Sequence, residues 1–95
     1  MNRDQALVAR HRVTIVNQRG LHARAAAKFV KLAATYEAEI TVTKDGVEVS
    51  GASIMGLMML AAGPGTEIEL QAKGPGREAA VSGLAALVAA GFHED

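Results

Sequence analysis

The chain has 95 residues, enough for one domain with one modest hydrophobic core. Its formal net charge is zero, so the molecule as a whole is not a general polyanion binder. It has no cysteine, which excludes disulfides, thiolate metal sites and thiol catalysis. Tryptophan is absent and aromatic residues make up only 3% of the chain, so the core is expected to consist of small aliphatic side chains.

Nothing in the sequence predicts a membrane segment or a secretion signal. No apolar run approaches the roughly 20 residues that a spanning helix needs. The opening stretch "MNRDQALVARHR" lacks the apolar centre and cleavage site of a signal peptide. We therefore expect a cytoplasmic domain without membrane insertion.

The first third of the chain predicts a strand followed by a helix. Residues 1–10 are expected to be a loose N-terminus. "HRVTIVN" (11–17) is rich in β-branched residues and predicts a strand. Residues 22–35 predict the first helix, because apolar residues recur at helical spacing on one side of it. These residues are Ala26, Phe29, Val30 and Ala33.

A hairpin is predicted next. The segments 38–44 and 46–51 alternate apolar and polar residues around Asp45-Gly46, a dipeptide typical of two-residue hairpin turns. The residues expected to face the core are Ile40, Val42, Val47 and Val49.

The last part of the chain predicts two helices separated by a strand. "SIMGLMMLAAG" (53–63) predicts a short helix that Ser53 begins and Gly63 ends. "TEIELQA" (66–72) predicts a strand with Ile68, Leu70 and Ala72 pointing inward. Residues 77–91 predict the last helix, with one apolar stripe made of Val81, Leu84, Leu87 and Val88.

The predicted order is β-α-β-β-α-β-α, which favours an α+β open-faced β-sandwich. In this fold three helices cover one face of a four-stranded antiparallel sheet. No linker or internal repeat divides residues 1–95, so we expect a single domain.

Charge is unevenly distributed along the chain. Residues 1–31 contain seven of the ten Lys and Arg residues and only one acid, Asp4. Residues 32–95 contain the other nine acids. This asymmetry predicts a cationic face near His22.

"RGLHARAAAKFV" (19–30) places a histidine where the chain passes from a glycine loop into a helix. A helix N-terminus offers unpaired N–H groups and the positive end of the helix dipole, so it attracts phosphate. At His22 a neutral imidazole could attack phosphorus there. Gly20 lets the loop bend and leaves room for a partner, and Arg24 could bind phosphoryl oxygens. The alternative from spacing alone is that His22 is only a tolerated cap residue.

Two motifs, "GLHARAAAKFV" and "SIMGLMML", resemble HPr, the histidine-containing phosphocarrier of the bacterial phosphotransferase system (PTS). The resemblance runs from about residue 11 to 91. It implies that His22 is the phosphorylated residue, that Nδ1 accepts the phosphoryl group, and that Arg24 is its partner. It also implies a regulatory phosphorylation site at Ser53 and a partner-docking surface. The residues expected in that surface are Gly20, Leu21, Ile54, Met55 and Met58.

The sequence departs from the resemblance at Ala25, where many members of the family have proline. Alanine is an excellent helix former, so the helix should survive. The alanine-rich segment is more similar to carriers of the nitrogen-related branch of the phosphotransferase system than to sugar-uptake carriers.

The remaining chemistry-bearing residues are interpreted as structural. His11 and His93 are expected on the surface, because nothing near them supplies a second ligand or base. Some methionines of the second helix should be exposed, since that helix is apolar on more than one side. Met59 is expected in the core.

By resemblance, the function is to accept a phosphoryl group from enzyme I and deliver it to an enzyme IIA protein. A serine kinase/phosphorylase acting on Ser53 is a further expected partner. The chain should act as a monomer, without nucleic acid, metal or organic cofactor, and not as an autonomous enzyme. The alternative is a regulatory module that acts only by docking to other proteins.

Overall fold

The structure is a computed structural model and describes residues 7–94. One antiparallel sheet contains β1 (Val8–Thr14), β2 (Glu39–Lys44), β3 (Val47–Ser50) and β4 (Glu67–Lys73) in the order β1-β4-β2-β3. The helices are α2 (Ala23–Ala33), α3 (Ile54–Met59) and α4 (Arg77–Ala89), and a 3-10 turn, η1 (Gly91–His93), ends the fold. The predicted element order and the open-faced sandwich are both confirmed.

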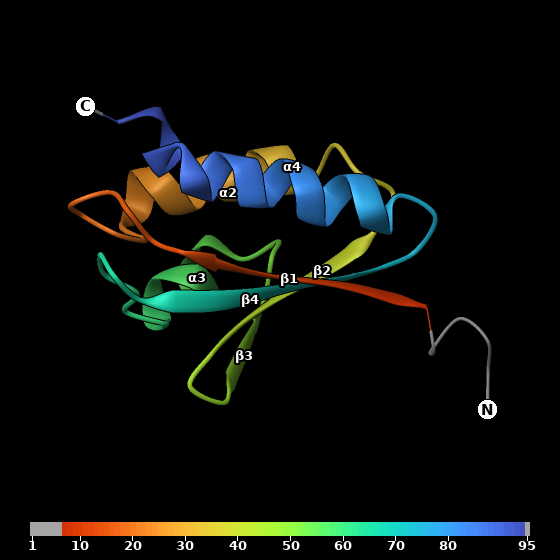
Figure 1. The fold of residues 1–95 in the computed structure, drawn as a ribbon, viewed down its shortest axis with the longest axis horizontal. Coiled ribbons are helices and arrows are strands. Elements are labelled where there is room, and N and C mark those ends of the chain that lie inside the picture. Colours follow the sequence, from red (N-terminus) through yellow and green to blue (C-terminus); the bar gives the residue numbers. More distant parts are fainter. Residues whose placement is uncertain (1–6, 95) are drawn as a thin grey trace.

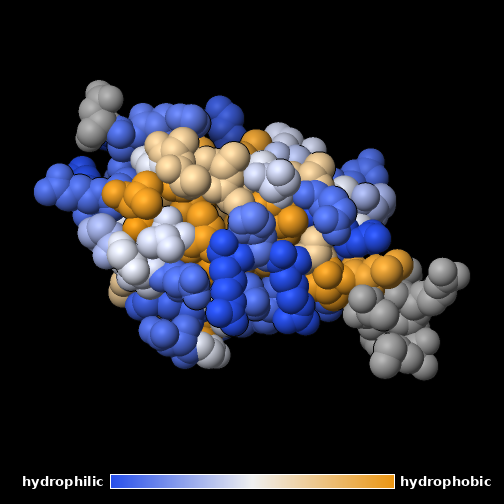
Figure 2. All heavy atoms as spheres, in the orientation of Figure 1, coloured by the Kyte–Doolittle hydropathy of each residue, from blue (hydrophilic) through white to orange (hydrophobic). Residues whose placement is uncertain are grey.

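Helices α2 and α4 lie together over one face of the sheet, and α3 packs against α2 (Figure 1). In the view of Figure 2, hydrophilic side chains gather over the middle of the sheet, and apolar residues surface along the seam between sheet and helices. Arg12 belongs to the polar side and lies 3.5 Å from Glu67 and 3.8 Å from Glu69. One face of the sheet is therefore covered and the other is polar.

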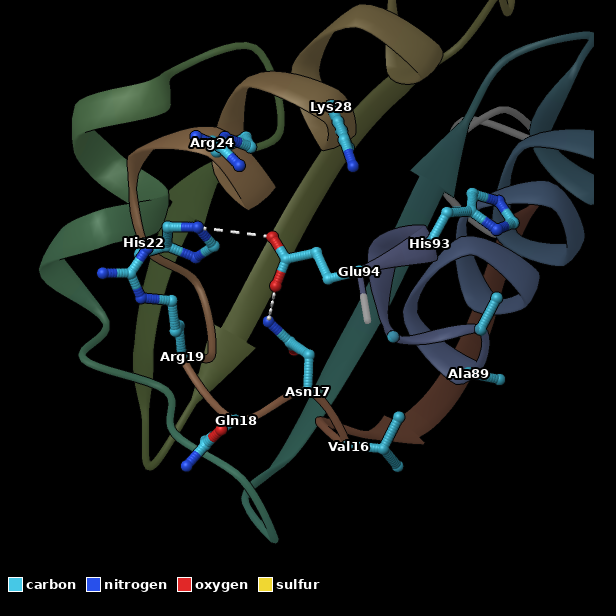
Figure 3. Close-up of a pocket in the computed structure, with 12 residues that line it drawn as sticks. Val16, Asn17, Gln18, Arg19, His22, Arg24, Lys28, Ala89, His93 and Glu94 are labelled. Carbon is cyan, nitrogen blue, oxygen red and sulfur yellow. Dashed lines mark hydrogen bonds and ion pairs between the residues drawn. The ribbon is translucent and has the colours of Figure 1, made fainter.

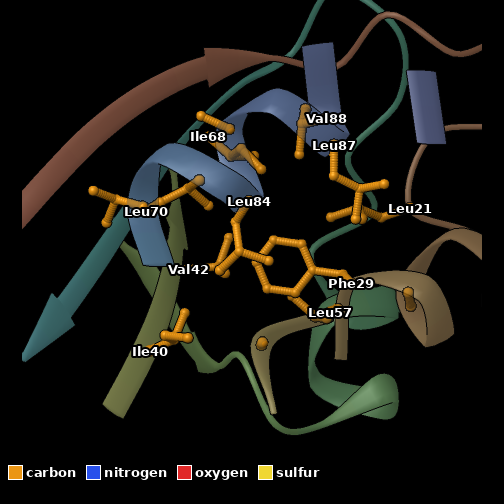
Figure 4. Close-up of a cluster of buried hydrophobic side chains, with 14 of the residues drawn as sticks. Leu21, Phe29, Ile40, Val42, Leu57, Ile68, Leu70, Leu84, Leu87 and Val88 are labelled. Atoms are coloured by element: carbon orange, nitrogen blue, oxygen red, sulfur yellow. The ribbon is translucent and has the colours of Figure 1, made fainter. Parts of the chain in front are cut away.

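The core fills the space between the helices and the covered face of the sheet. Phe29 is fully buried and lies among Leu57 of α3, Leu84 of α4 and Val42 of β2 (Figure 4). Burying one such aromatic side chain stabilises the fold by about 2–3 kcal/mol. The inward residues predicted for β4 and α4 are all buried, which confirms both stripes.

The N-terminal strand begins earlier than predicted. Residues 1–6 of the expected loose N-terminus lie outside the described residues, but 8–10 belong to β1. The predicted strand 11–17 was wrong at both ends, because the ladder with β4 pairs Val8 with Lys73 and Thr14 with Glu67. Ile15 still exchanges backbone hydrogen bonds with Thr66 and Gly65, and in the turn that follows the side chain of Asn17 donates to the carbonyl oxygen of Gly20.

Helix α3 is shorter than predicted, and Gly63 does not end it. The backbone turns instead at Ala61, which has a φ of +51°. A non-glycine residue in this left-handed region costs roughly 1 kcal/mol. Lys44 offsets this cost, because its Nζ donates to the Leu60 carbonyl oxygen at 3.0 Å. This capping contact comes from Lys44 at the end of β2, so the sequence around α3 contains no signal for it.

Two residues expected in the core are exposed. Val47 lies on the edge strand β3 beside the turn, with 55% of its surface accessible. Met59 has 78% of its surface accessible, because Leu57 and Leu60 supply the core contacts of α3. The prediction for Met59 was wrong because a short helix with apolar residues on several sides does not reveal which side is buried, whereas Val47 is exposed because it begins the edge strand.

Within residues 7–94, no helix has the length and apolar character needed to cross a bilayer.

Candidate functional site

His22 occupies the N-cap position of α2, where the chain leaves the loop. Its carbonyl oxygen accepts the first helical hydrogen bond, from the N–H of Ala26, at 2.9 Å. Its side chain makes no capping hydrogen bond, so the ring is free for other contacts. Alanine at position 25, where the resemblance leads one to expect proline, leaves the helix intact and places a buried methyl group in its first turn. His22 therefore occupies the cap position without capping the helix through its side chain.

The imidazole of His22 is partly buried, with 24% of the side chain exposed. It lines a depression of about 810 Å³ between the start of α2, the loop before it and the end of α4. Three cationic side chains line the same depression: Arg19, Arg24 and Lys28 (Figure 3). With the N–H groups of the first turn of α2, they make this an anion-attracting site. The cationic face predicted near His22 is present.

The C-terminal tail reaches this site through an unusual turn. Phe92 and His93 have φ values of +56° and +57°, a conformation that costs of the order of 1–3 kcal/mol for each residue. The turn is held because Phe92 is fully buried and its carbonyl oxygen accepts a hydrogen bond from Nζ of Lys28 at 2.7 Å. The chain is thereby directed back over the start of α2.

The tail brings Glu94 against the imidazole. Oε2 of Glu94 lies 3.3 Å from Nε2 of His22, and Oε1 accepts a hydrogen bond from the side-chain nitrogen of Asn17 at 3.0 Å (Figure 3). The other ring nitrogen, Nδ1, lies 3.1 Å from the Gly20 carbonyl oxygen. Both ring nitrogens therefore face an oxygen.

Gly20 and Leu21 do not lie on the surface. Leu21 is 5% exposed, and its N–H donates to the carbonyl oxygen of Ala62 at 3.0 Å. Gly20 is buried with a φ of +61°, and a Cβ at this position would overlap the same Ala62 oxygen. Both side-chain positions are largely enclosed, so the docking role expected of them stays a prediction. Both residues support the loop that holds His22.

Ser53 begins α3 as predicted. Its Oγ accepts a hydrogen bond from the N–H of Gly56 at 2.9 Å, which confirms its role as an N-cap. A Ser-to-Ala change at such a cap costs about 1 kcal/mol.

Four exposed apolar side chains project from α3, and we call them the α3 patch: Ile54, Met55, Met58 and Met59. Met58 and His22 line one shallow depression of about 290 Å³, so the α3 patch adjoins the imidazole. Met55 is 74% exposed, a large value for an unbranched apolar side chain. Such a surface is typical of adaptable protein contacts.

His11 and His93 are both exposed, as expected. His11 lies on β1, and His93 lies in the tail turn at the rim of the depression. Among residues 7–94, no three His, Asp or Glu side chains come together as metal ligands.

Sequence reasoning missed the residues that close the site. Asn17 and Glu94 are 77 positions apart, and nothing local marks Glu94 as a neighbour of His22. Lys28 could have been found, because it lies one helical turn after Arg24 and faces the same side.

Comparison with known proteins identifies the family. Residues 9–90 match the family model PTS-HPr, described as "PTS HPr component phosphorylation site". The phosphocarrier protein HPr of Cupriavidus necator is 44% identical over 85% of this chain and 91% of its own length. The phosphocarrier protein NPr of Shewanella violacea is 48% identical over 86% of this chain and 90% of its own.

A solved structure agrees with these relatives. The HPr phosphocarrier of Bacillus anthracis has a TM-score of 0.82 and 42% identity, over 85% of this chain and 96% of its own. The family model, the relatives and the solved structure each cover most of the chain, and the range matched by the family model includes His22. This chain therefore belongs to the HPr family of phosphocarrier proteins of the phosphotransferase system, which carry a phosphoryl group and are not enzymes.

Proposed function

We propose that His22 accepts a phosphoryl group from phosphorylated enzyme I and passes it to a histidine of an enzyme IIA protein. The observation that carries this proposal is the position of His22. This residue is the N-cap of α2, and its imidazole lines a depression together with Arg19, Arg24 and Lys28. It also falls inside the range that matches the phosphorylation-site model. The carrier acts in the cytoplasm, as a monomer, and needs no bound cofactor for this exchange.

The chemistry requires one neutral ring nitrogen and a place for negative charge. Nδ1, the acceptor that the resemblance implies, attacks the phosphorus atom carried by enzyme I. As the new bond forms, the bond between phosphorus and the nitrogen of enzyme I breaks, and its electron pair returns to the ring of that donor. The dianionic group then lies beside the start of α2 and the cationic side chains. Transfer to the acceptor is the same reaction in reverse.

The α3 patch supplies the docking surface in this proposal. It adjoins His22, so a partner that covers the patch also covers the imidazole. Covering exposed methionine and isoleucine side chains provides binding energy without fixing one partner geometry, which suits a carrier with a donor and an acceptor.

The nitrogen-related branch fits this chain as well as the sugar-uptake branch. The NPr relative is 48% identical and an HPr relative from Neisseria meningitidis is 46% identical, over 82 residues each. Assays with enzyme IIA proteins of both branches will identify the preferred acceptor by its transfer rate.

Intact-mass measurement tests the proposed function. After incubation with enzyme I and phosphoenolpyruvate, the protein should carry one phosphoryl group, which acid should remove. Addition of an enzyme IIA protein should return the carrier to its original mass. No mass change with active enzyme I would contradict the proposal.

Replacing Arg24 with alanine should slow phosphoryl transfer roughly 10- to 100-fold, the loss expected for a charge-assisted hydrogen bond. Arg24 is exposed, so the free energy of unfolding should change by less than about 0.5 kcal/mol. Lys31→Ala is the control, since it removes an exposed cation from the last turn of the same helix. Equal transfer rates in the two variants would remove Arg24 from the site.

Replacing Ser53 with aspartate should weaken binding to enzyme I and raise KM more than it lowers kcat. Aspartate also caps helices, so the fold should be retained. Its charge lies beside Ile54 and Met55, where an apolar partner surface has to approach. Ser53→Ala is the control: it removes the cap but adds no charge.

The effect of charge at position 53 and the effect of apolar contact at Met55 can be separated by varying the salt concentration. The effect of Ser53→Asp should shrink at high ionic strength, whereas that of Met55→Ala should not. If Ser53→Asp transfers like the unchanged protein at low salt, Ser53 is a cap and has no regulatory role.

A further inference from the structure

We infer that Glu94 is a positioning residue for His22: it holds the hydrogen on Nε2 and thereby makes Nδ1 the phosphoryl acceptor. The inference deepens the proposed function, on which its consequence for transfer rests. It concerns the tautomer of the ring and can be measured without any protein partner.

The contact between Glu94 and His22 is partly shielded from water. The Glu94 side chain is 17% exposed and that of His22 is 24% exposed. Oε2 of Glu94 is buried and has no hydrogen-bond partner within residues 7–94, so its contact with His22 is an ion-pair distance and not a formed hydrogen bond. The only cationic or N–H-bearing side-chain group paired with it there is the imidazole, with Nε2 at 3.3 Å. Leaving a buried carboxylate oxygen unpaired is costly, so a hydrogen on Nε2 is strongly favoured.

The position of Glu94 is set by contacts on both sides of it. Asn17 binds its Oε1, and the same side-chain nitrogen of Asn17 binds the Gly20 carbonyl oxygen at 2.9 Å. The tail before it is anchored by the buried Phe92 and by Lys28. The contacts of Asn17, Phe92 and Lys28 therefore hold Glu94 beside the ring.

The two oxygens around the ring favour different nitrogens. Gly20 at 3.1 Å favours a hydrogen on Nδ1, and Glu94 favours one on Nε2. An imidazolium satisfies both, but it has no lone pair for attack on phosphorus. When the ring loses one proton, the carboxylate retains the Nε2 hydrogen because a charged acceptor binds it more strongly than a neutral carbonyl does.

The neutral ring is then ready to react at Nδ1. The Nδ1 lone pair and the Gly20 oxygen repel each other, so Nδ1 is not held by that carbonyl, and Arg24 and Lys28 line the depression in which the ring lies (Figure 3). As Nδ1 bonds to phosphorus and the donor leaves with its electron pair, positive charge develops on the ring. Glu94 stabilises that charge through Nε2–H, as a carboxylate does for a catalytic histidine.

The negative charge of Glu94 also repels the incoming phosphoryl group. That group attaches at Nδ1, farther from the carboxylate than Nε2, and Arg24 and Lys28 lie around the same depression. The stabilising interaction acts at 3.3 Å and in a shielded place, so it should be the larger of the two.

The decisive measurement is the tautomer of His22 in three proteins: the unchanged chain, Glu94→Gln and Glu94→Ala. Ring 15N NMR at an alkaline pH, where histidine is neutral, should show Nε2–H in the unchanged chain. In Glu94→Ala the Gly20 oxygen alone remains, so most of the ring should change to Nδ1–H. Glu94→Gln keeps an acceptor and should remain largely Nε2–H.

Chemical phosphorylation gives a second readout. Phosphoramidate, a small donor that needs no protein partner, should label Nδ1 in the unchanged chain. In Glu94→Ala it should label Nε2 to a large extent, because that nitrogen is uncovered and carries the lone pair. Glu94→Gln should label at Nδ1 about five- to tenfold more slowly, since it lacks the charge. Glu48→Gln, which removes an exposed carboxylate on β3, is the matched control and should behave like the unchanged chain.

The two proposals fail in different ways. If the Glu94→Ala ring keeps the Nε2–H tautomer and is still labelled only at Nδ1, Glu94 does not position His22. If the tautomer changes as expected but enzyme I labels none of these proteins, the positioning role stands and the proposed carrier function is wrong.

Discussion

Replacing His22 with alanine should abolish phosphoryl transfer completely, because His22 is the histidine at the start of α2, whereas His93 lies only at the rim of the same depression. With enzyme I and phosphoenolpyruvate, the intact mass of the variant should stay unchanged. The fold should persist, because the side chain makes no capping hydrogen bond and the core does not depend on it. Circular dichroism and thermal unfolding check this second point.

A histidine elsewhere on the surface serves as the control. His11 is exposed on β1, and His11→Ala should accept the phosphoryl group at the unchanged rate. If labelling persists in His22→Ala and disappears in His11→Ala, the acceptor is His11 and the assignment to His22 is wrong. A protein that is never labelled but still binds enzyme I would support the docking-module alternative.

Replacing Gly20 with alanine should have the largest effect on stability, lowering the free energy of unfolding by about 2–4 kcal/mol. Two costs combine at this position. The φ of +61° disfavours any residue with a Cβ, and the new Cβ overlaps the carbonyl oxygen of Ala62. Relief of that overlap moves the segment after α3, so phosphoryl transfer should fall as well. Urea unfolding followed by circular dichroism measures the stability change.

Gly65 provides a control that isolates the conformational cost. Its φ is +87°, but a Cβ there meets no atom within 4 Å. Gly65→Ala should therefore cost about 1–2 kcal/mol and leave transfer unchanged. If Gly20→Ala is no more destabilising than Gly65→Ala, the close approach between the loop and Ala62 does not constrain the site.

The fold was predictable from the sequence where one periodicity governs a long segment. The stripes of α2 and α4 and the alternation in β4 each identify one buried side. Prediction failed at short or terminal elements, where partners from elsewhere decide. The end of α3 depends on Lys44, and the extent of β1 depends on its pairing with β4.

In the candidate site, too, some features could be predicted from the sequence and others could not. His22 and Arg24 could be predicted, because a loop, a helix start and two side chains lie within six residues of sequence from Arg19 to Arg24. The contacts on the ring could not. They come from the Gly20 carbonyl oxygen and from Glu94, which reaches the site only because two residues in succession adopt a left-handed backbone.

The turn at Phe92 and His93 has a practical consequence for anyone who labels or fuses this protein. Glu94 lies at the imidazole, while β1 starts at the opposite end of the molecule (Figure 1). A tag attached on the C-terminal side of Glu94 adds chain and charge next to the reacting ring, whereas one attached on the N-terminal side of β1 enters the fold far from it. Kinetic constants measured on carriers tagged at the two ends should therefore differ, and only the N-terminal fusion should reproduce those of the untagged protein.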